Sequence, residues 1–175
     1  RARKVTFYEG GIRVPFCIKW PGITKAGTET DFLVNGVDFM PTFAEVVSAP
    51  LPENQPVDGI SFLPLLQNPS FKKGRDMFFH FPLYLGGGRQ DAVLPAYDGT
   101  ENYWRAVPSS VIISGDWKLI HHYEYDKTEL YNLKEDISEE HDLSETEPEK
   151  AKQLLQKLNN WLEETGAPVP DVLNR

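Results

Sequence analysis

The first residues that could take part in chemistry form a charged turn near the start of the chain. Lys4 stands five residues ahead of Glu9, which is followed by the two glycines Gly10 and Gly11. A lysine ammonium is a compact positive charge with three hydrogen-bond donors, so it suits an anion. Glycines can adopt positive φ and let the backbone pass close to other groups, so the pair predicts a sharp turn. From these residues alone, Lys4 could equally be a solvated surface charge.

An apolar segment, Val14 to Trp20, follows this turn and must help to position it. Its valine, phenylalanine and isoleucine lack regular alternation, which predicts a strand buried on both faces in a mostly parallel sheet covered by helices. Pro21 and Gly22 should end the strand, because proline cannot donate to a sheet ladder and glycine favours a turn. Cys17 lies inside this segment and is expected to be a buried, inert thiol.

The whole stretch from Lys4 to Gly22 resembles the sulfatase signature of the alkaline-phosphatase-like superfamily. It contains the lysine, the Glu-Gly-Gly turn, Arg-x-Pro, an apolar run and Trp-Pro-Gly in that order. Two later stretches, 37–42 and 58–66, are similar to segments of the same family. The resemblance implies that Lys4 binds the substrate's sulfate and stabilises charge in the transition state. Asp38 and Asp58 could be considered as metal ligands, but a helix cap and a turn are the favoured roles.

The resemblance also implies that the reacting groups lie outside this sequence. Sulfatases hydrolyse sulfate monoesters with a formylglycine, made from the cysteine or serine of Cys/Ser-x-Pro-x-Arg, and with a divalent cation, usually calcium, held by Asp and Asn. Cys17 is followed by Ile-Lys-Trp, so it is not that nucleophile. The chain also starts within the motif and shows no signal peptide. We therefore expect the C-terminal third of an exported sulfatase (periplasmic, extracellular or lysosomal), inactive by itself because the nucleophile and metal are missing.

Substrate contacts are the next implication of the resemblance, because the C-terminal subdomain of a sulfatase packs beside the mouth of the active site. The candidates are His80, Arg89, Trp104 and Arg105. An arginine fork suits carboxylate or sulfate, and a tryptophan face suits a pyranose ring. Each candidate also has a structural alternative: a histidine satisfied in a core, a tryptophan anchoring its loop, or a solvated arginine. His121 and His122 are weaker candidates because a strand places them on opposite faces.

The predicted fold class is α/β, part of the alkaline-phosphatase-like fold, with an α+β C-terminal subdomain. Residues 1–82 are assigned to the end of the catalytic α/β domain and include a helix after Asp38 and a strand over 77–82. Residues 83–108 form a long loop, a possible insertion on the substrate side, because unstructured loops of that length are functional or disordered. Its three glycines do not make a P-loop, since no Gly-Lys-Ser/Thr follows them.

Residues 109–175 are assigned to a subdomain of antiparallel strands and one helix. Strands over 110–114, 117–125 and 129–133 predict a three-stranded meander with tight turns. Leucines and Trp161 at helical spacing over 151–162 predict a helix that covers one face, with Ser144 or Thr146 as N-cap and Gly166 after its end. The stretch Leu-Tyr-Asn-Leu-x-x-Asp from Leu130 onward resembles the sulfatase C-terminal sheet. The acidic run 135–149 is interpreted as a solvated approach to the helix.

Composition limits the partners. A net charge of −8 without a lysine or arginine cluster argues against nucleic acid, and no apolar run is long enough to span a bilayer. A single cysteine cannot form an internal disulfide, and no Cys/His spacing resembles a zinc site. We expect the chain to bind a sulfated carbohydrate or another sulfate ester together with the missing N-terminal portion. Self-association through an uncovered face is also considered.

Three functions stay open at the level of sequence. The leading one is a sulfatase acting on a sulfated carbohydrate or a small aryl or alkyl sulfate. A second is a phosphodiesterase or phosphonate hydrolase of the same superfamily, and a third is a carbohydrate-binding or interaction module. The upstream sequence separates them, because Cys/Ser-x-Pro-x-Arg favours a sulfatase, whereas an unmodified threonine or serine nucleophile favours the phosphorus enzymes.

Overall fold

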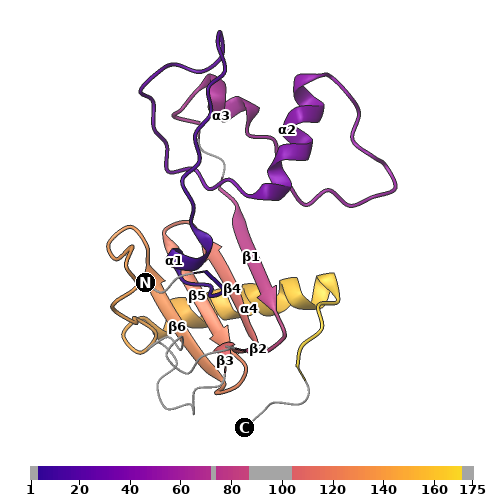
Figure 1. Cartoon of the computed structure of the whole chain (residues 1–175). Coiled ribbons are helices and arrows are strands. Elements are labelled where there is room, and N and C mark those ends of the chain that lie inside the picture. Colours follow the sequence, from indigo (N-terminus) through magenta and orange to yellow (C-terminus); the bar gives the residue numbers. More distant parts are fainter. Residues whose placement is uncertain (1–3, 72–73, 87–103, 171–175) are drawn as a thin grey trace. The chain divides into compact units, whose positions relative to one another are not determined.

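A computed structural model describes residues 4–71, 74–86 and 104–170 of the chain. The chain divides into two compact units: Arg1–Val14 together with Gly74–Arg175, and Pro15–Lys73. The sequence placed a boundary at residue 82 instead. The two divisions differ because strand β1 (Asp76–Phe81) pairs with a strand of the C-terminal part (Figure 1).

The first unit is built on one antiparallel sheet in the order β1-β4-β5-β6. Its other strands are β4 (Ser109–Ser114), β5 (Trp117–His122) and β6 (Lys127–Asn132). The predicted meander of β4, β5 and β6 is confirmed, and its turns place Gly115 and Asp126 at positive φ. The predicted strand over 77–82 is confirmed as β1, but it is antiparallel to β4 rather than part of a parallel sheet.

One face of this sheet is covered by helix α4 (Pro148–Thr165). The ring of Phe78 in β1 stacks on Trp161 with centroids 4.8 Å apart. The core between sheet and helix consists of Ile112, Leu119, Leu130, Ala151, Leu154, Leu158 and Leu162. Each large apolar side chain buried there stabilises the fold by about 1.5–3 kcal/mol. The predicted helix and its buried face are therefore confirmed.

The ends of α4 agree only in part with the sequence. The helix begins at Pro148 after Glu147, which makes no side-chain cap, so the predicted caps Ser144 and Thr146 were wrong. Proline at the first helical position has no N–H to satisfy, which favours this start. The helix ends at Gly166, whose φ of 61° is the left-handed conformation that glycine adopts at low cost.

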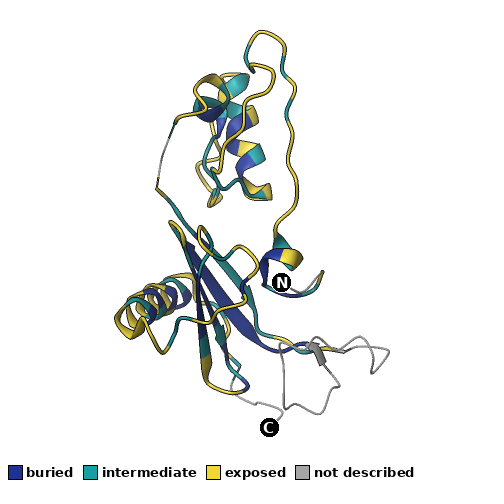
Figure 2. Cartoon of the chain, turned by 90° about the vertical axis from the view of Figure 1, so that its left-hand side faces the viewer, coloured by how far each residue is buried: buried dark blue, intermediate teal, exposed yellow. Residues whose placement is uncertain are grey.

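The opposite face of the sheet is covered by the N-terminal segment, which contains the short helix α1 (Glu9–Ile12). Figure 2 shows α1 and α4 on opposite sides of the sheet. Strands β2 (Leu85–Gly86) and β3 (Trp104–Ala106) pair antiparallel, so the two ends of the predicted loop 83–108 are joined. Residues 87–103 lie outside the described part of the chain.

The second unit contains the 3-10 helix η1 (Gly36–Asp38) and helices α2 (Phe39–Val46) and α3 (Leu63–Gln67). The Asp38 carboxylate accepts the backbone N–H groups of Asn35 at 2.7 Å and Ile60 at 3.0 Å. These bonds satisfy a buried carboxylate locally and agree with a structural role for Asp38 rather than a metal ligand. None of the helices in the described ranges is long and apolar enough to cross a membrane.

The predicted buried strand over 14–20 was wrong. These residues have no regular secondary structure and belong to neither sheet formed by the described residues. Val14 is 75% exposed and Phe16 is 46% exposed, although Phe16 packs edge to face against Phe39 and Phe62. Cys17 is exposed, so the expectation of a buried thiol was also wrong. Pro15 and Pro21 bracket the segment and cannot donate to a sheet ladder.

Candidate functional site

The turn that carries Lys4 is tightly folded. Lys4 is exposed, and the next residue, Val5, has a φ of 93°. A β-branched residue at such a φ is a genuine outlier that costs about 1–3 kcal/mol, and such strain occurs where the surroundings force it. A Cβ on Gly11 would lie 2.0 Å from the carbonyl oxygen of Thr6. Only glycine therefore lets the chain turn back so closely behind Lys4.

A buried ionic cluster fastens this turn to the sheet. The Lys118 Nζ lies 3.0 Å from Glu9 Oε1 and 2.7 Å from Glu139 Oε1. The backbone N–H of Glu9 donates to the other oxygen of Glu139 at 2.7 Å. Arg13 adds a contact of 3.3 Å to Glu9 Oε2 from the surface. One α1 residue is thus joined to β5 and to the segment after β6.

The electrostatics of this cluster require every member. The side chains of Lys118 and Glu139 are 0% exposed, and that of Glu9 is 8% exposed. A buried charge is tolerated when it is paired and hydrogen-bonded, and removal of one partner leaves the others as uncompensated buried charges. Glu139 also has a φ of 56°, an uncommon conformation for a residue with a side chain. The backbone there is held in the conformation that presents both carboxylate oxygens to the cluster.

Tyr8 provides a second tether from the same turn. Its hydroxyl donates to Glu129 Oε2 at 2.6 Å, and the hydroxyl of Tyr131 donates to the same oxygen at 2.9 Å. Burial by itself would raise the pKa of Glu129, but the nearby imidazole of His122 and the two tyrosine hydroxyls outweigh it and lower the pKa to about 2. Glu129 is therefore an anion throughout the physiological range. Two carboxylates, Glu139 and Glu129, consequently anchor adjoining residues of the turn.

A Ser-His-Glu arrangement lies beside this tether but lacks the properties of a nucleophile. Ser109 Oγ lies 2.9 Å from His122 Nδ1, and His122 Nε2 lies 3.7 Å from Glu129 Oε2. The Ser109 hydroxyl donates its hydrogen to the carbonyl of Val107 at 2.9 Å, so it accepts from the histidine. Ser109 is 1% exposed. A buried hydroxyl whose proton points away from the histidine is structural.

His80 lies on the other face of the sheet, with α4. Its Nε2 donates to the carbonyl of Pro168 at 2.9 Å, because a carbonyl can only accept. Its Nδ1 lies 2.7 Å from Ser110 Oγ, which in turn lies 2.7 Å from the hydroxyl of Tyr123. Both ring nitrogens are thus used inside the fold, which agrees with the structural alternative. The structure does not bring His80 and the Lys4 turn together, and substrate binding by His80 stays a prediction.

The other candidate substrate contacts are Arg89, Trp104 and Arg105. Arg89 lies outside the described residues, and Trp104 and Arg105 are placed only as backbone of β3. In the described ranges no group of three or more His, Cys, Asp or Glu residues could hold a metal ion. The described residues therefore offer no such ligand group for the divalent cation that the resemblance implies.

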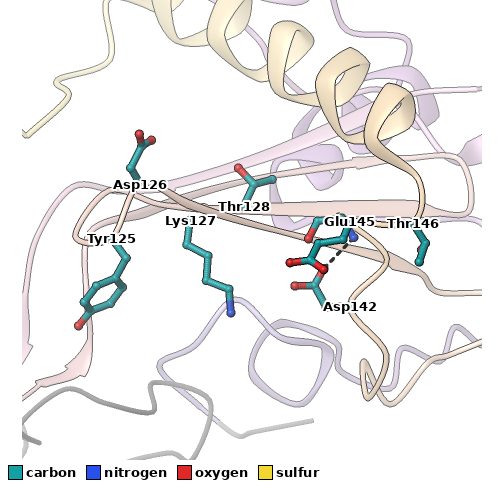
Figure 3. A pocket seen from close by; sticks show the side chains of 8 residues that line it. Tyr125, Asp126, Lys127, Thr128, Asp142, Glu145 and Thr146 are labelled. Atoms are coloured by element: carbon teal, nitrogen blue, oxygen red, sulfur yellow. Dashed lines mark hydrogen bonds between the residues drawn. The ribbon is translucent and has the colours of Figure 1, made fainter.

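A surface pocket lies where the β5–β6 turn faces the segment before α4 (Figure 3). The Asp142 carboxylate is occupied structurally, because it accepts the backbone N–H of Leu130 at 3.0 Å and of Ser144 at 2.9 Å. The lining residues are Tyr125, Asp126, Lys127, Thr128, Asp142, Ser144, Glu145 and Thr146. Three carboxylates against a single lysine would repel a sulfate, so this pocket is not suited to an anionic substrate.

Sequence reasoning missed the groups that hold the turn. Glu139 had been assigned to a solvated acidic run, but it is fully buried, so that interpretation was wrong for this residue. The strand alternation did place Lys118 on the face away from α4, and a lysine beside large apolar residues was a signal for a buried partner. Nothing local identified that partner, because Glu9 is 109 residues from Lys118 in the sequence.

A protein family accounts for almost the whole chain. The family model described as N-sulphoglucosamine sulphohydrolase, C-terminal, matches residues 3–167. A sulfatase of Formosa agariphila is 34% identical over 96% of the chain, which covers 30% of that protein. The human steryl-sulfatase is 38% identical over 45% of the chain, equal to 13% of its own length.

Solved structures give the same result for the fold. A protein in complex with its substrate, D-glucosamine-2-N,6-O-disulfate, superposes with a TM-score of 0.68 and 26% identity. The superposition covers 95% of this chain and 31% of that protein. The chain therefore spans about a third of the length of these relatives, and its fold is that of their C-terminal part.

Proposed function

Because this chain belongs to the family of the C-terminal part of N-sulphoglucosamine sulphohydrolase, we propose that the complete protein is a sulfatase that hydrolyses a sulfate monoester. The observation that supports this most directly is the Lys4 turn. In this turn the exposed Lys4 directly precedes the strained residue Val5, and buried ion pairs join the turn to the sheet. Such an arrangement suits a cation that must be held in one place.

Lys4 has one role in this proposal. A sulfate ester is negatively charged throughout hydrolysis, and charge grows on the departing oxygen in the transition state. A fixed ammonium with three donors can bind the sulfate oxygens and stabilise that charge without reorganising during the reaction. A formylglycine and a divalent cation, when present in the complete protein, would supply the nucleophile and neutralise the sulfate. Among the described residues, no group of three or more His, Cys, Asp or Glu side chains could hold that cation.

The substrate class in the proposal is a sulfated carbohydrate. Support comes from the family description and from the relative solved with a disulfated glucosamine. Arg89, Trp104 and Arg105 are kept as candidate contacts to the sugar or to a second anionic group. The resemblance further leads us to propose that the complete protein is exported. A phosphodiesterase or phosphonate hydrolase is less favoured, because the family model and these relatives are sulfatases.

The test is substitution of Lys4 in the complete protein. We expect Lys4→Ala to lower kcat/KM for an aryl sulfate by two or more powers of ten, the size of effect seen when an oxyanion donor is lost. Lys19→Ala is the matched control, because Lys19 is another exposed lysine of the sequence stretch 4–22. The chain by itself is the negative control, since it lacks the nucleophile motif. Near-normal turnover by Lys4→Ala would contradict the proposed role.

A further inference from the structure

We infer that Tyr8 and Glu9 are positioning residues for Lys4, and that Glu139 and Glu129 of the C-terminal sheet are the fixed points against which they hold it. This inference rests on the proposed function, because it takes Lys4 as the sulfate-binding group. It adds residues from the far end of the sequence to a site that otherwise consists of a single lysine.

Two successive residues of the turn are bonded to the C-terminal sheet and the segment after it. Tyr8 is bonded through its side chain to Glu129 at 2.6 Å, and Glu9 through its backbone N–H to Glu139 at 2.7 Å. Both acceptors are buried carboxylates, so these bonds are charge-assisted and stronger than neutral ones. These bonds fix Tyr8 and Glu9, the residues from which the chain leads back to Lys4.

Strained backbone occurs both at the turn and at its anchor. Val5, next to Lys4, is held at a φ of 93°, and Glu139, which receives the Glu9 N–H, at 56°. Strained backbone persists only where the surroundings determine it, and it clusters at sites that must be preorganised. Two of the four non-glycine residues with positive φ in the described part of the chain are thus the neighbour of Lys4 and the residue that anchors Glu9.

The anchor of the turn consists of buried charged side chains. Lys118 is the cation that permits Glu9 and Glu139 to be buried side by side. A buried ionic cluster adds little stability compared with apolar packing, and its best-attested use is to specify one arrangement. The cluster therefore acts as a specificity device for the geometry of the Lys4 turn. Displacement of a reacting group by about 1 Å can cost a hundredfold in rate, so such a device has a kinetic effect.

A double-mutant cycle in the complete protein tests this. Glu139→Gln is expected to lower kcat/KM for an aryl sulfate by about tenfold to a hundredfold when Lys4 is present, on the order of that loss from misplacement. In the Lys4→Ala background the same change should have an effect of no more than about twofold, because a residue that acts through another is not additive with it. Glu140→Gln is the matched control, since Glu140 is the neighbouring carboxylate and is exposed.

Hydrogen exchange supplies the structural readout. Glu139→Gln should speed amide exchange at Thr6–Gly11 but leave α4 unchanged, and Glu140→Gln should change neither. If Glu139→Gln does not fold, Tyr8→Phe removes the bond to Glu129 without unbalancing charge, and should lower kcat/KM severalfold only when Lys4 is present. Equal losses with Lys4 intact and in the Lys4→Ala background would overturn the inference and leave the proposed function intact. Normal turnover by Lys4→Ala would overturn both.

Discussion

Removal of the buried cation should be the most damaging single change in this part of the protein. Lys118→Met keeps a side chain of similar length but leaves Glu9 and Glu139 without their shared partner. At 3.0 and 2.7 Å, and with an effective dielectric constant of about 20, each contact is worth about 5–6 kcal/mol of Coulomb attraction. Burial of the ions cancels much of this, and loss of one member of a buried cluster typically costs about 3–5 kcal/mol.

Hydrogen exchange in the complete protein is the assay, because it reports the local free energy of opening of β5. A loss of about 3–5 kcal/mol should accelerate exchange of the Trp117–His122 amides by about two to four powers of ten, since 1.4 kcal/mol is tenfold. The acceleration should extend to Thr6–Ile12, because Glu9 joins the two segments.

The chain offers a matched control on the same face of the same sheet. Lys127 Nζ lies 3.3 Å from Glu129 Oε1, but its side chain is 53% exposed. Water screens such a pair, which is worth about 0–1 kcal/mol, so Lys127→Met should change exchange by less than about tenfold. Lys118→Arg should retain part of the stability because it keeps the charge. If Lys118→Met behaved like Lys127→Met, the reasoning about burial and pairing would be refuted.

Two further predictions concern the same turn and sheet. Gly11→Ala should destabilise the turn by about 1–3 kcal/mol, because its Cβ would meet the Thr6 carbonyl at 2.0 Å. Faster exchange at Tyr8–Ile12 would show this, whereas Gly36→Ala, where a Cβ meets nothing within 4 Å, should have little effect. The pKa of Glu129 is lowered from 4.5 to about 2, so its contribution to stability is complete above pH 4.5 and is lost as the pH falls towards 2. Glu129→Gln should flatten this acid loss in a pH series of melting temperatures; an unchanged acid profile would contradict the assignment.

The fold of the C-terminal sheet could be predicted because its signals are local. Alternation in β5 and the leucine spacing of α4 depend on residues a few positions apart, and each element has its complementary apolar surface nearby in sequence. The strand over 14–20 was predicted by the same reasoning and was wrong. Apolar composition alone does not distinguish a buried strand from a segment such as Phe16, which packs its ring against Phe39 and Phe62 without joining a sheet.

Of the residues in the proposed site, only Lys4 could be named from the sequence. Lys4 and the glycine turn came from a resemblance carried by neighbouring residues, whereas the groups that hold them are distant partners. Tyr8 and Glu129 are 121 residues apart, and Glu9 and Glu139 are 130 apart. The sequence alone does not distinguish a buried carboxylate from an exposed one unless its partner is known. Glu139 was therefore assigned to solvent on the strength of its acidic neighbours, and the fold shows the opposite.

These long-range bonds join residues on the two sides of the boundary predicted at residue 82. The turn of Lys4 and the strands β1, β4, β5 and β6 lie in one compact unit. Within this unit, Lys118 contacts both Glu9 in α1 and Glu139 in the segment after β6. We therefore expect that a substitution in the sheet can change the position of Lys4 without a direct contact to it. Under the proposed function, the C-terminal sheet holds the turn of the sulfate-binding lysine, and substitutions of Lys118 and Glu139 are the places where that role can be tested.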